Sequence, residues 1–177
     1  MLEIKKKSKD FNFVETNIRK MTFGVLTTAD KNGIPHSAGI LYGVSPPKSK
    51  FSLFCLTGTN YKKVRNIKEN PNIAFVIPYP HHLLRFVPAS CVQFQGKAEI
   101  LPFDNTEAQE TFSNKNILKM NLKQAESMDG DKSDLVFIKI KPNQKIFCYG
   151  LGISLRELSK NVEIGGYTVL IPAERYQ

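Results

Sequence analysis

Residues 51–77 read FSLFCLTGTNYKKVRNIKENPNIAFVI, and this segment changes its pattern twice. Residues 51–57 are dense in apolar side chains, which predicts a strand buried on both faces. In the stretch that follows, two aliphatic residues lie three apart among Lys and Arg, as in a short helix that Asn60 caps and Pro71 stops. Residues 72–79, NIAFVIPY, predict another strand. The segment therefore predicts strand, helix and strand.

The flanking sequence predicts further strands. TFGVLTTA (22–29) and IPHSAGILYGV (34–44) surround Asn32-Gly33, a pair that favours a tight hairpin turn. Residues 10–21 predict a short helix with Asp10 as N-cap. Further along the chain we expect strands at 89–102, 135–142 and 143–150, helices within 104–126, a short helical turn, and a terminal hairpin around Gly165-Gly166. Six or seven strands joined by short connections predict a mainly β (α+β) fold, an antiparallel closed or nearly closed barrel with a few short helices.

The chain has 177 residues, of which 41% are hydrophobic, and this favours one domain with a real core. We expect residues 1–9 to be a basic tail and 10–177 to be that single domain. The formal charge of +9 favours an anionic partner, namely nucleic acid, an acidic membrane or a phosphorylated small molecule, although basic surfaces also occur without one. The three scattered cysteines, the lack of a secretory signal and the short apolar runs predict a soluble cytoplasmic protein with no membrane partner.

The junction at residues 57–63 has the composition of an anion site. The N–H groups at a helix N-terminus are unpaired and favour negative charge. Thr57 and Thr59 add hydroxyl donors, Gly58 permits close approach of the backbone, and Lys62 and Lys63 add positive charge. The alternative is a solvated helix with two surface lysines.

Three stretches together resemble the pyridoxamine 5′-phosphate oxidase-like family of FMN-binding split β-barrels: residues 25–44, 51–77 and 92–101. The likeness lies in their order, with turn-linked strands, a strand ending in Thr, a Lys before a short helix, Asn-Pro, and an apolar strand closing on Gly. It covers about residues 10–102. It implies a six- or seven-stranded split barrel and a homodimer that holds FMN between its subunits.

The resemblance also implies which residues hold the cofactor. Lys63 matches the family lysine that contacts the FMN phosphate, and Lys62 stands where an Arg is frequent. Thr57 matches the threonine at the strand end, and Tyr61 stands where a phosphate-binding serine is frequent. The remaining positions are the strand that edges the isoalloxazine ring and two glutamines near the closing glycine: Ile40, Leu41, Tyr42, Gln93 and Gln95.

The sequence departs from the oxidase at three positions. Ala38 and Gly43 stand where the oxidase carries an Arg and a Lys on its second strand, and Cys91 stands where it has a glutamine. The resemblance therefore implies the flavin scaffold without pyridoxamine phosphate oxidation, because function belongs to the site and not to the fold. We expect a flavin-dependent oxidoreductase acting on a small redox substrate that the sequence does not identify.

Other functions remain open at this stage. The alternative is a non-catalytic carrier of flavin, deazaflavin F420 or haem, and FAD is a further possible flavin. Adjacent histidines, His81 and His82, point to opposite faces of a strand and do not favour a metal site, and His36 predicts an exposed strand position. Nucleic-acid binding is disfavoured because the aromatic residues lie mostly within apolar strands: Phe51, Phe54, Phe75, Phe94 and Phe137.

Overall fold

The computed structural model describes residues 9–79, 88–127 and 134–177, and the predictions for His81 and His82 lie outside these ranges. Within the described residues, every strand joins one antiparallel sheet. The strands are β1 (Phe23–Ala29), β2 (Pro35–Leu41), β3 (Gly43–Val44), β4 (Leu53–Gly58), β5 (Asn72–Tyr79), β6 (Ser90–Pro102), β7 (Leu135–Pro142), β8 (Lys145–Tyr149) and β9 (Gly166–Leu170). The helices are α1 (Phe11–Lys20), α2 (Lys62–Glu69), α3 (Thr106–Ser113), α4 (Asn116–Ser127), α5 (Leu155–Lys160) and the 3₁₀ turn η2 (Val162–Gly165).

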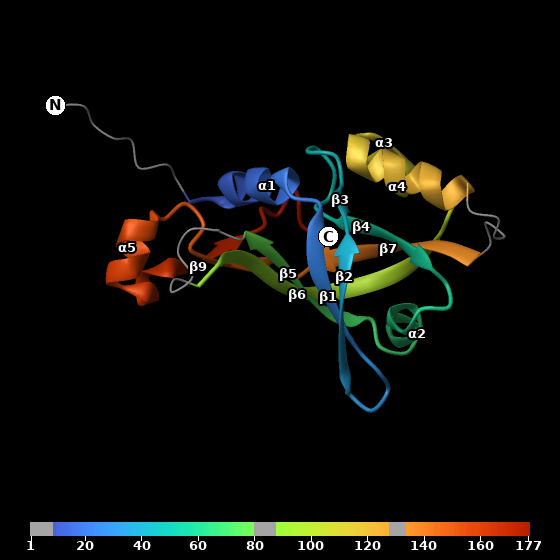
Figure 1. Cartoon of the computed structure of the whole chain (residues 1–177), viewed down its shortest axis with the longest axis horizontal. Helices are drawn as coiled ribbons and strands as arrows, with labels where there is room; N and C mark the ends of the chain where they lie inside the picture. The colour runs from blue at the N-terminus through green and yellow to red at the C-terminus, as the bar shows by residue number, and fades with distance from the viewer. Residues whose placement is uncertain (1–8, 80–87, 128–133) are drawn as a thin grey trace.

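The sheet curls into a half-barrel, as Figure 1 shows. Its strand order is β2-β1-β5-β6-β7-β4-β3, and β8 and β9 extend it from β6. The long strand β6 pairs along one edge first with β8 and then with β7, so the sheet turns a corner near Gly96. A Cβ at Gly96 would lie 2.3 Å from the Lys141 carbonyl oxygen, so only glycine fits this close approach. The prediction of a mainly β, antiparallel fold with the curl of a split barrel is confirmed.

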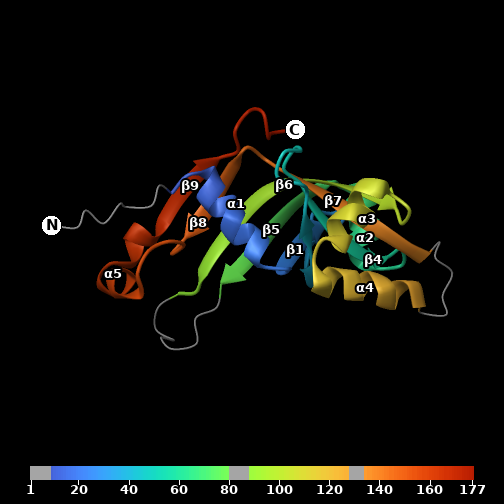
Figure 2. The ribbon, with the colours of Figure 1, turned by 90° about the horizontal axis from the view of Figure 1, so that it is seen from above.

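Two apolar clusters stabilise this arrangement. The larger one lies inside the curl, where α1 crosses the sheet (Figure 2) and buries Phe11, Val14 and Ile18. Asp10 caps α1 as predicted, because its Oδ1 accepts a hydrogen bond of 2.9 Å from the Phe13 N–H. The smaller cluster joins α3 and α4 to the sheet through Ala108, Phe112, Leu118, Leu122, Phe54 and Phe137.

Three local predictions are wrong. Asn60 does not cap α2, because the N-cap is Tyr61, which makes no side-chain hydrogen bond to the helix. The predicted strand at 34–44 is divided into β2 and β3 at Tyr42. No hairpin forms at Gly165-Gly166, because Asn161 caps the 3₁₀ turn there and β9 pairs with β8. The division at Tyr42 adds one strand to those expected.

Two further predictions of local structure are confirmed. The hairpin between β1 and β2 turns at Gly33, which has a φ of 80°. The aromatic residues expected in the core are buried, with Phe51, Phe54, Phe75 and Phe137 no more than 1% exposed. Among the described residues, no helix is long and apolar enough to span a membrane.

Candidate functional site

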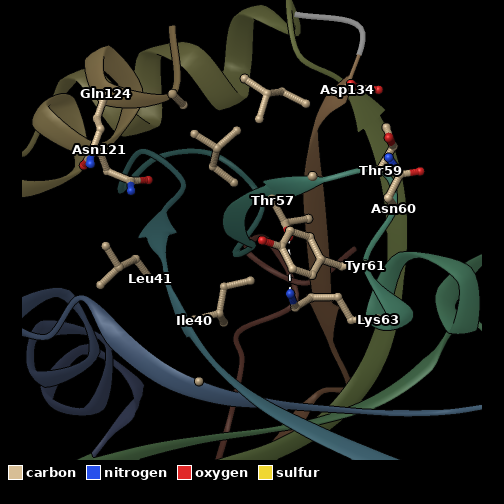
Figure 3. A pocket seen from close by; sticks show the side chains of 15 residues that line it. Ile40, Leu41, Thr57, Thr59, Asn60, Tyr61, Lys63, Asn121, Gln124 and Asp134 are labelled. Atoms are coloured by element: carbon tan, nitrogen blue, oxygen red, sulfur yellow. Dashed lines mark hydrogen bonds between the residues drawn. The ribbon is translucent and has the colours of Figure 1, made fainter. Parts of the chain in front are cut away.

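A groove of about 770 Å³ lies where the two ends of the curled sheet approach each other. One wall is β2, at residues 39–41, and the opposite wall is the end of β4 with the loop that leads into α2. α4 and the start of β7 complete it, as Figure 3 shows. Among the described strands, β2 is the last at its end of the sheet, so no described strand pairs with its second edge, which lies along this groove. One wall of the groove is therefore a strand edge with unpaired backbone groups, and side chains form the other walls.

Lys63 supplies the positive charge of the groove. Its Nζ donates a hydrogen bond of 3.3 Å to Thr57 Oγ1 and lies 4.2 Å from the centroid of the Tyr61 ring. Partial burial lowers the pKa of the Lys63 amine, and the nearby Cys55 acts in the opposite direction. Burial also raises the pKa of the Cys55 thiol, so Cys55 is uncharged at neutral pH. Burial of Lys63 is therefore the main influence on the pKa of its amine. The groove thus holds one partly desolvated amine beside a hydroxyl.

The N-terminus of α2 borders the same region, because Tyr61 and Lys63 both line the groove. Tyr61 has extended backbone angles, φ −73° and ψ 147°, and its side chain leaves the helix end uncapped. An uncapped helix N-terminus keeps unpaired donors and a partial positive charge. With Lys63 and Thr57, this end of the groove has the chemistry that binds a phosphate or another compact anion.

The free edge of β2 presents backbone donors and acceptors to the groove. In an antiparallel strand, one residue directs both its N–H and its C=O to the strand on one side, and the next residue directs both to the other side. The Tyr42 N–H donates to the Thr22 carbonyl at 2.8 Å, and Ile40 lies opposite Gly24, so these residues face β1. Gly39 and Leu41 therefore direct their N–H and C=O groups away from β1, towards the groove. Such an edge can hydrogen-bond the polar rim of a flat ring.

The structure places several lining residues that the sequence did not reveal. Asn121, Gln124 and Ala125 come from α4, and Asp134 directly precedes β7. The Asp134 carbonyl accepts a hydrogen bond of 2.8 Å from the Thr59 N–H, which ties the loop before α2 to β7. The three-residue spacing of Asn121 and Gln124 shows that they share a helix face, but nothing local indicates that this face borders β2.

The predicted cofactor residues fall into two groups. Six line the groove: Ile40, Leu41, Thr57, Thr59, Tyr61 and Lys63. The other four lie elsewhere: Lys62, Tyr42, Gln93 and Gln95. Lys62 is exposed, and Tyr42 is buried with its hydroxyl donating to the Ile18 carbonyl at 2.8 Å. Gln93 and Gln95 lie on the outer face of β6, in a hollow of about 370 Å³ that Phe147 also lines.

The other reactive side chains in the described ranges are a histidine and three cysteines. In the described part of the chain, no three His, Cys, Asp or Glu residues come together as a ligand set. His36 is half-buried, so the prediction of an exposed position is wrong, and its Nδ1 has no hydrogen-bond partner among the described residues. The cysteines are free, and burial raises the pKa of Cys148 to about 12. At neutral pH this thiol is therefore protonated and a poor metal ligand.

Comparison with known proteins places this geometry in a family. The model of the pyridoxamine 5′-phosphate oxidase family matches residues 12–148. No curated protein matches the chain. HutZ, the haem storage protein of Vibrio cholerae, is similar with a TM-score of 0.64 at 16% identity, over 81% of this chain and 98% of that chain. General Stress Protein 26 of Bacillus anthracis has a TM-score of 0.52 at 26% identity, over 75% of this chain and 88% of that chain.

An F420 reductase is also similar, with a TM-score of 0.50 at 23% identity, over 73% of this chain and 92% of that chain. At such identities, the likeness to this reductase and to HutZ shows a shared fold. The names of these proteins include haem and F420, so the fold alone does not decide the cofactor. The family model covers more than half of the sequence, including both walls of the groove at β2 and β4. This chain belongs to the pyridoxamine 5′-phosphate oxidase family.

Proposed function

We propose that the groove binds FMN and that the protein is a flavin-dependent oxidoreductase. The observation that carries this proposal is the position of Lys63, with its ammonium beside Thr57 at the uncapped N-terminus of α2. A phosphate monoester matches this set of donors in charge and in size. Lys62, on the first turn of the same helix, adds to the local positive potential.

The rest of the groove fits a flat heteroaromatic ring. The backbone edge at Gly39 and Leu41 offers donors and acceptors, and Ile40 and Leu56 add apolar surface. On the other side, the amides of Asn121 and Gln124 can both donate and accept hydrogen bonds. When bound, the flavin would supply hydride and electron transfer, while this chain's residues orient it and limit its contact with water.

The same structure argues against oxidation of pyridoxamine phosphate. Gly43 stands where the oxidase has a lysine, and it is buried beneath α3. A Cβ added at Gly43 would lie 2.7 Å from Thr111 Cγ2 and 3.2 Å from Leu118 Cδ1. A long cationic side chain would not fit there without displacing α3. The substrate of the flavin would therefore differ from that of the oxidase.

We also propose that the protein is a homodimer with the cofactor near the subunit interface. A row of outward-facing residues crosses five strands, because Val25 pairs with Val76, Val76 with Gln93, Gln93 with Phe147, and Phe147 with Thr168. Phe147 is 37% exposed, so the row presents aromatic surface beside aliphatic and polar side chains. A second copy packed on this face would bring Gln93 and Gln95 towards its partner's groove.

Haem and deazaflavin are the alternatives. The groove fits haem less well than FMN, because its described lining residues include no His, Cys or Met, and its tyrosine is already in contact with Lys63. A deazaflavin carries a similar ring and also a phosphate, so the same donors suit both. The hydrogen-bond donors of the groove therefore do not distinguish a flavin from a deazaflavin, and spectroscopy is needed to identify the bound ring.

The test is an absorbance spectrum of the purified protein, as isolated and after addition of FMN, each before and after dithionite. The proposal predicts the absorbance bands of an oxidised flavin, which bleach on reduction. A folded protein that stays colourless and does not bind added FMN would refute it. A Soret band would instead support the haem carrier, and the absorbance spectrum of a deazaflavin would support F420.

A further inference from the structure

Tyr61 is the N-cap residue of α2, but its side chain does not cap the helix. Ser, Thr, Asp and Asn are preferred at an N-cap because their side chains accept a hydrogen bond from the first turn. The Tyr61 side chain makes no such bond to α2, and the helix end is closed only by its carbonyl, which accepts from Val64 N and Arg65 N. The tyrosine is also 59% exposed, so apolar burial does not account for its place.

The ring of Tyr61 has two neighbours instead. On one side it packs over Gly58, where an added Cβ would lie 3.1 Å from Tyr61 Cε2, so any larger residue at 58 would push the ring away. Figure 3 shows the Lys63 side chain beside the ring. Its Nζ lies 4.2 Å from the ring centroid. Residues two apart do not meet on a helix. They meet here because the backbone of Tyr61 is still extended.

We propose that Tyr61 is a positioning residue that holds the Lys63 ammonium at the phosphate end of the groove before any ligand binds. The ring attracts the cation electrostatically, and Thr57 Oγ1 accepts a hydrogen bond from it on a second side. A free lysine side chain has four rotatable bonds that a ligand must immobilise. Holding the ammonium in advance removes part of that entropy loss, so Tyr61 strengthens binding of phosphorylated ligands selectively.

The identity of the ligand in this inference rests on the proposed function, whereas the contact between Tyr61 and Lys63 does not. Tyr61→Leu removes the ring and keeps an apolar, non-capping residue, whereas Tyr61→Phe keeps the ring. Both variants leave the charge and the cap chemistry of α2 unchanged. The leucine variant therefore tests the ring itself, and the phenylalanine variant is its matched control.

The first measurement is NMR of the ligand-free protein labelled with ¹³C at the lysine ε carbons. A lysine held over an aromatic face has its Hε signals shifted upfield by the ring. We expect Lys63, assigned through Lys63→Arg, to show this shift in the wild type and in Tyr61→Phe and to lose it in Tyr61→Leu. An unchanged Lys63 signal in Tyr61→Leu would overturn the inference, whether or not the protein binds flavin.

The second measurement compares FMN with riboflavin, which lacks the phosphate. We expect Tyr61→Leu to weaken FMN binding by roughly two- to five-fold, as exposed cation–π contacts allow, with riboflavin unchanged. Tyr61→Phe should bind both like the wild type. An unchanged ratio of the two dissociation constants in Tyr61→Leu would overturn the selective role and leave the proposed function standing. If the wild type binds neither flavin, the proposed function fails, and the NMR measurement still decides whether Tyr61 holds Lys63.

Discussion

Lys63 is the single residue on which the site depends most. Its ammonium is partly buried, touches Thr57 and Tyr61, and lies beside the N-terminus of α2. Burial lowers the pKa of this amine, whereas a bound phosphate would raise it again because an adjacent anion favours the charged form. Phosphate binding and protonation of Lys63 are therefore coupled.

This coupling predicts a specific alkaline limit to FMN binding. The protonated amine is the form that binds phosphate, so affinity is full below the pKa of Lys63 in the free protein and falls as pH rises through it. Because burial lowers that pKa, the loss begins at a lower pH than an ordinary lysine would give. The dissociation constant of FMN, measured between neutral and alkaline pH, should rise by up to about tenfold per pH unit in that range.

Lys63→Arg is the control for this prediction, since a guanidinium stays charged throughout the range. The riboflavin titration corrects for ionisation of the ring, which both ligands share. If the wild type and Lys63→Arg lose FMN affinity over the same pH range, the protonation state of Lys63 does not control binding.

Some of these residues were predictable because their placement is local. Lys63 and Thr57 bracket a strand end and a helix start, and that junction is visible in the sequence. Lys62 illustrates the limit, because neighbouring residues on a helix point about 100° apart, and the structure places it outside the groove lining. Tyr42 is likewise adjacent to Leu41 but points into the core, because side chains alternate along an extended segment.

At the level of secondary structure, α4 is the element whose position was hardest to predict from the sequence. Its polar composition predicted a helix but not its place opposite β2. That place is fixed by Leu118 and Leu122, which pack against Phe54 and Phe137 from strands far away in the sequence. Such long-range packing leaves no local signal, so Asn121 and Gln124 were not expected in the groove.

The position of α4 predicts how its amides contribute. Asn121→Ala with Gln124→Ala should weaken FMN and riboflavin equally, by roughly two- to tenfold per lost hydrogen bond, because these amides would contact the ring and not the phosphate. Fluorescence titration with both ligands measures this. An effect on FMN alone would place α4 at the phosphate end and contradict the proposed orientation.

α1 is held by a buried carboxylate. Glu15 is 6% exposed and accepts hydrogen bonds from Arg19 at 2.5 Å and from Arg175 at 2.8 Å, which ties α1 to the C-terminal segment. Replacing one member of a buried ionic group leaves the others unpaired. Glu15→Gln should therefore lower the free energy of unfolding by about 3 kcal/mol.

Urea denaturation measures this loss, and Glu99→Gln is the matched control. Glu99 pairs with Lys141 on the surface, where side-chain exposures are 42% and 34%, so its loss should be below about 1 kcal/mol. Equal losses in the two variants would mean that the Glu15 cluster is no more than a surface ion pair.

At the scale of the whole molecule, the curl of the sheet creates the groove. The prediction of an antiparallel barrel followed from the strand patterns and the short connections. The C-terminal region was less predictable, because Gly165-Gly166 has the composition of a turn. In the structure Gly165 is needed for close packing instead, since a Cβ there would lie 2.5 Å from the Tyr149 ring.

The exposed row on the outer sheet face predicts a dimer. The wild type should sediment at twice its chain mass of 20.0 kDa. Phe147→Glu, which places a charge within the row, should sediment as a monomer and bind FMN more weakly. Val162→Glu is the control, because Val162 is also exposed, at 48%, but lies outside the sheet. A wild-type monomer, or a Phe147→Glu dimer, would exclude this face as the interface.

The most direct test of the central claim is a pair of flavin titrations on the wild type and Lys63→Ala. Lys68→Ala serves as a control with the same change of charge, on the same helix but outside the groove lining. Loss of a charge-assisted contact to phosphate should weaken FMN binding by roughly ten- to a hundredfold in Lys63→Ala and leave riboflavin unchanged. Lys68→Ala should bind both like the wild type. FMN binding by Lys63→Ala that equals the wild type would contradict the account.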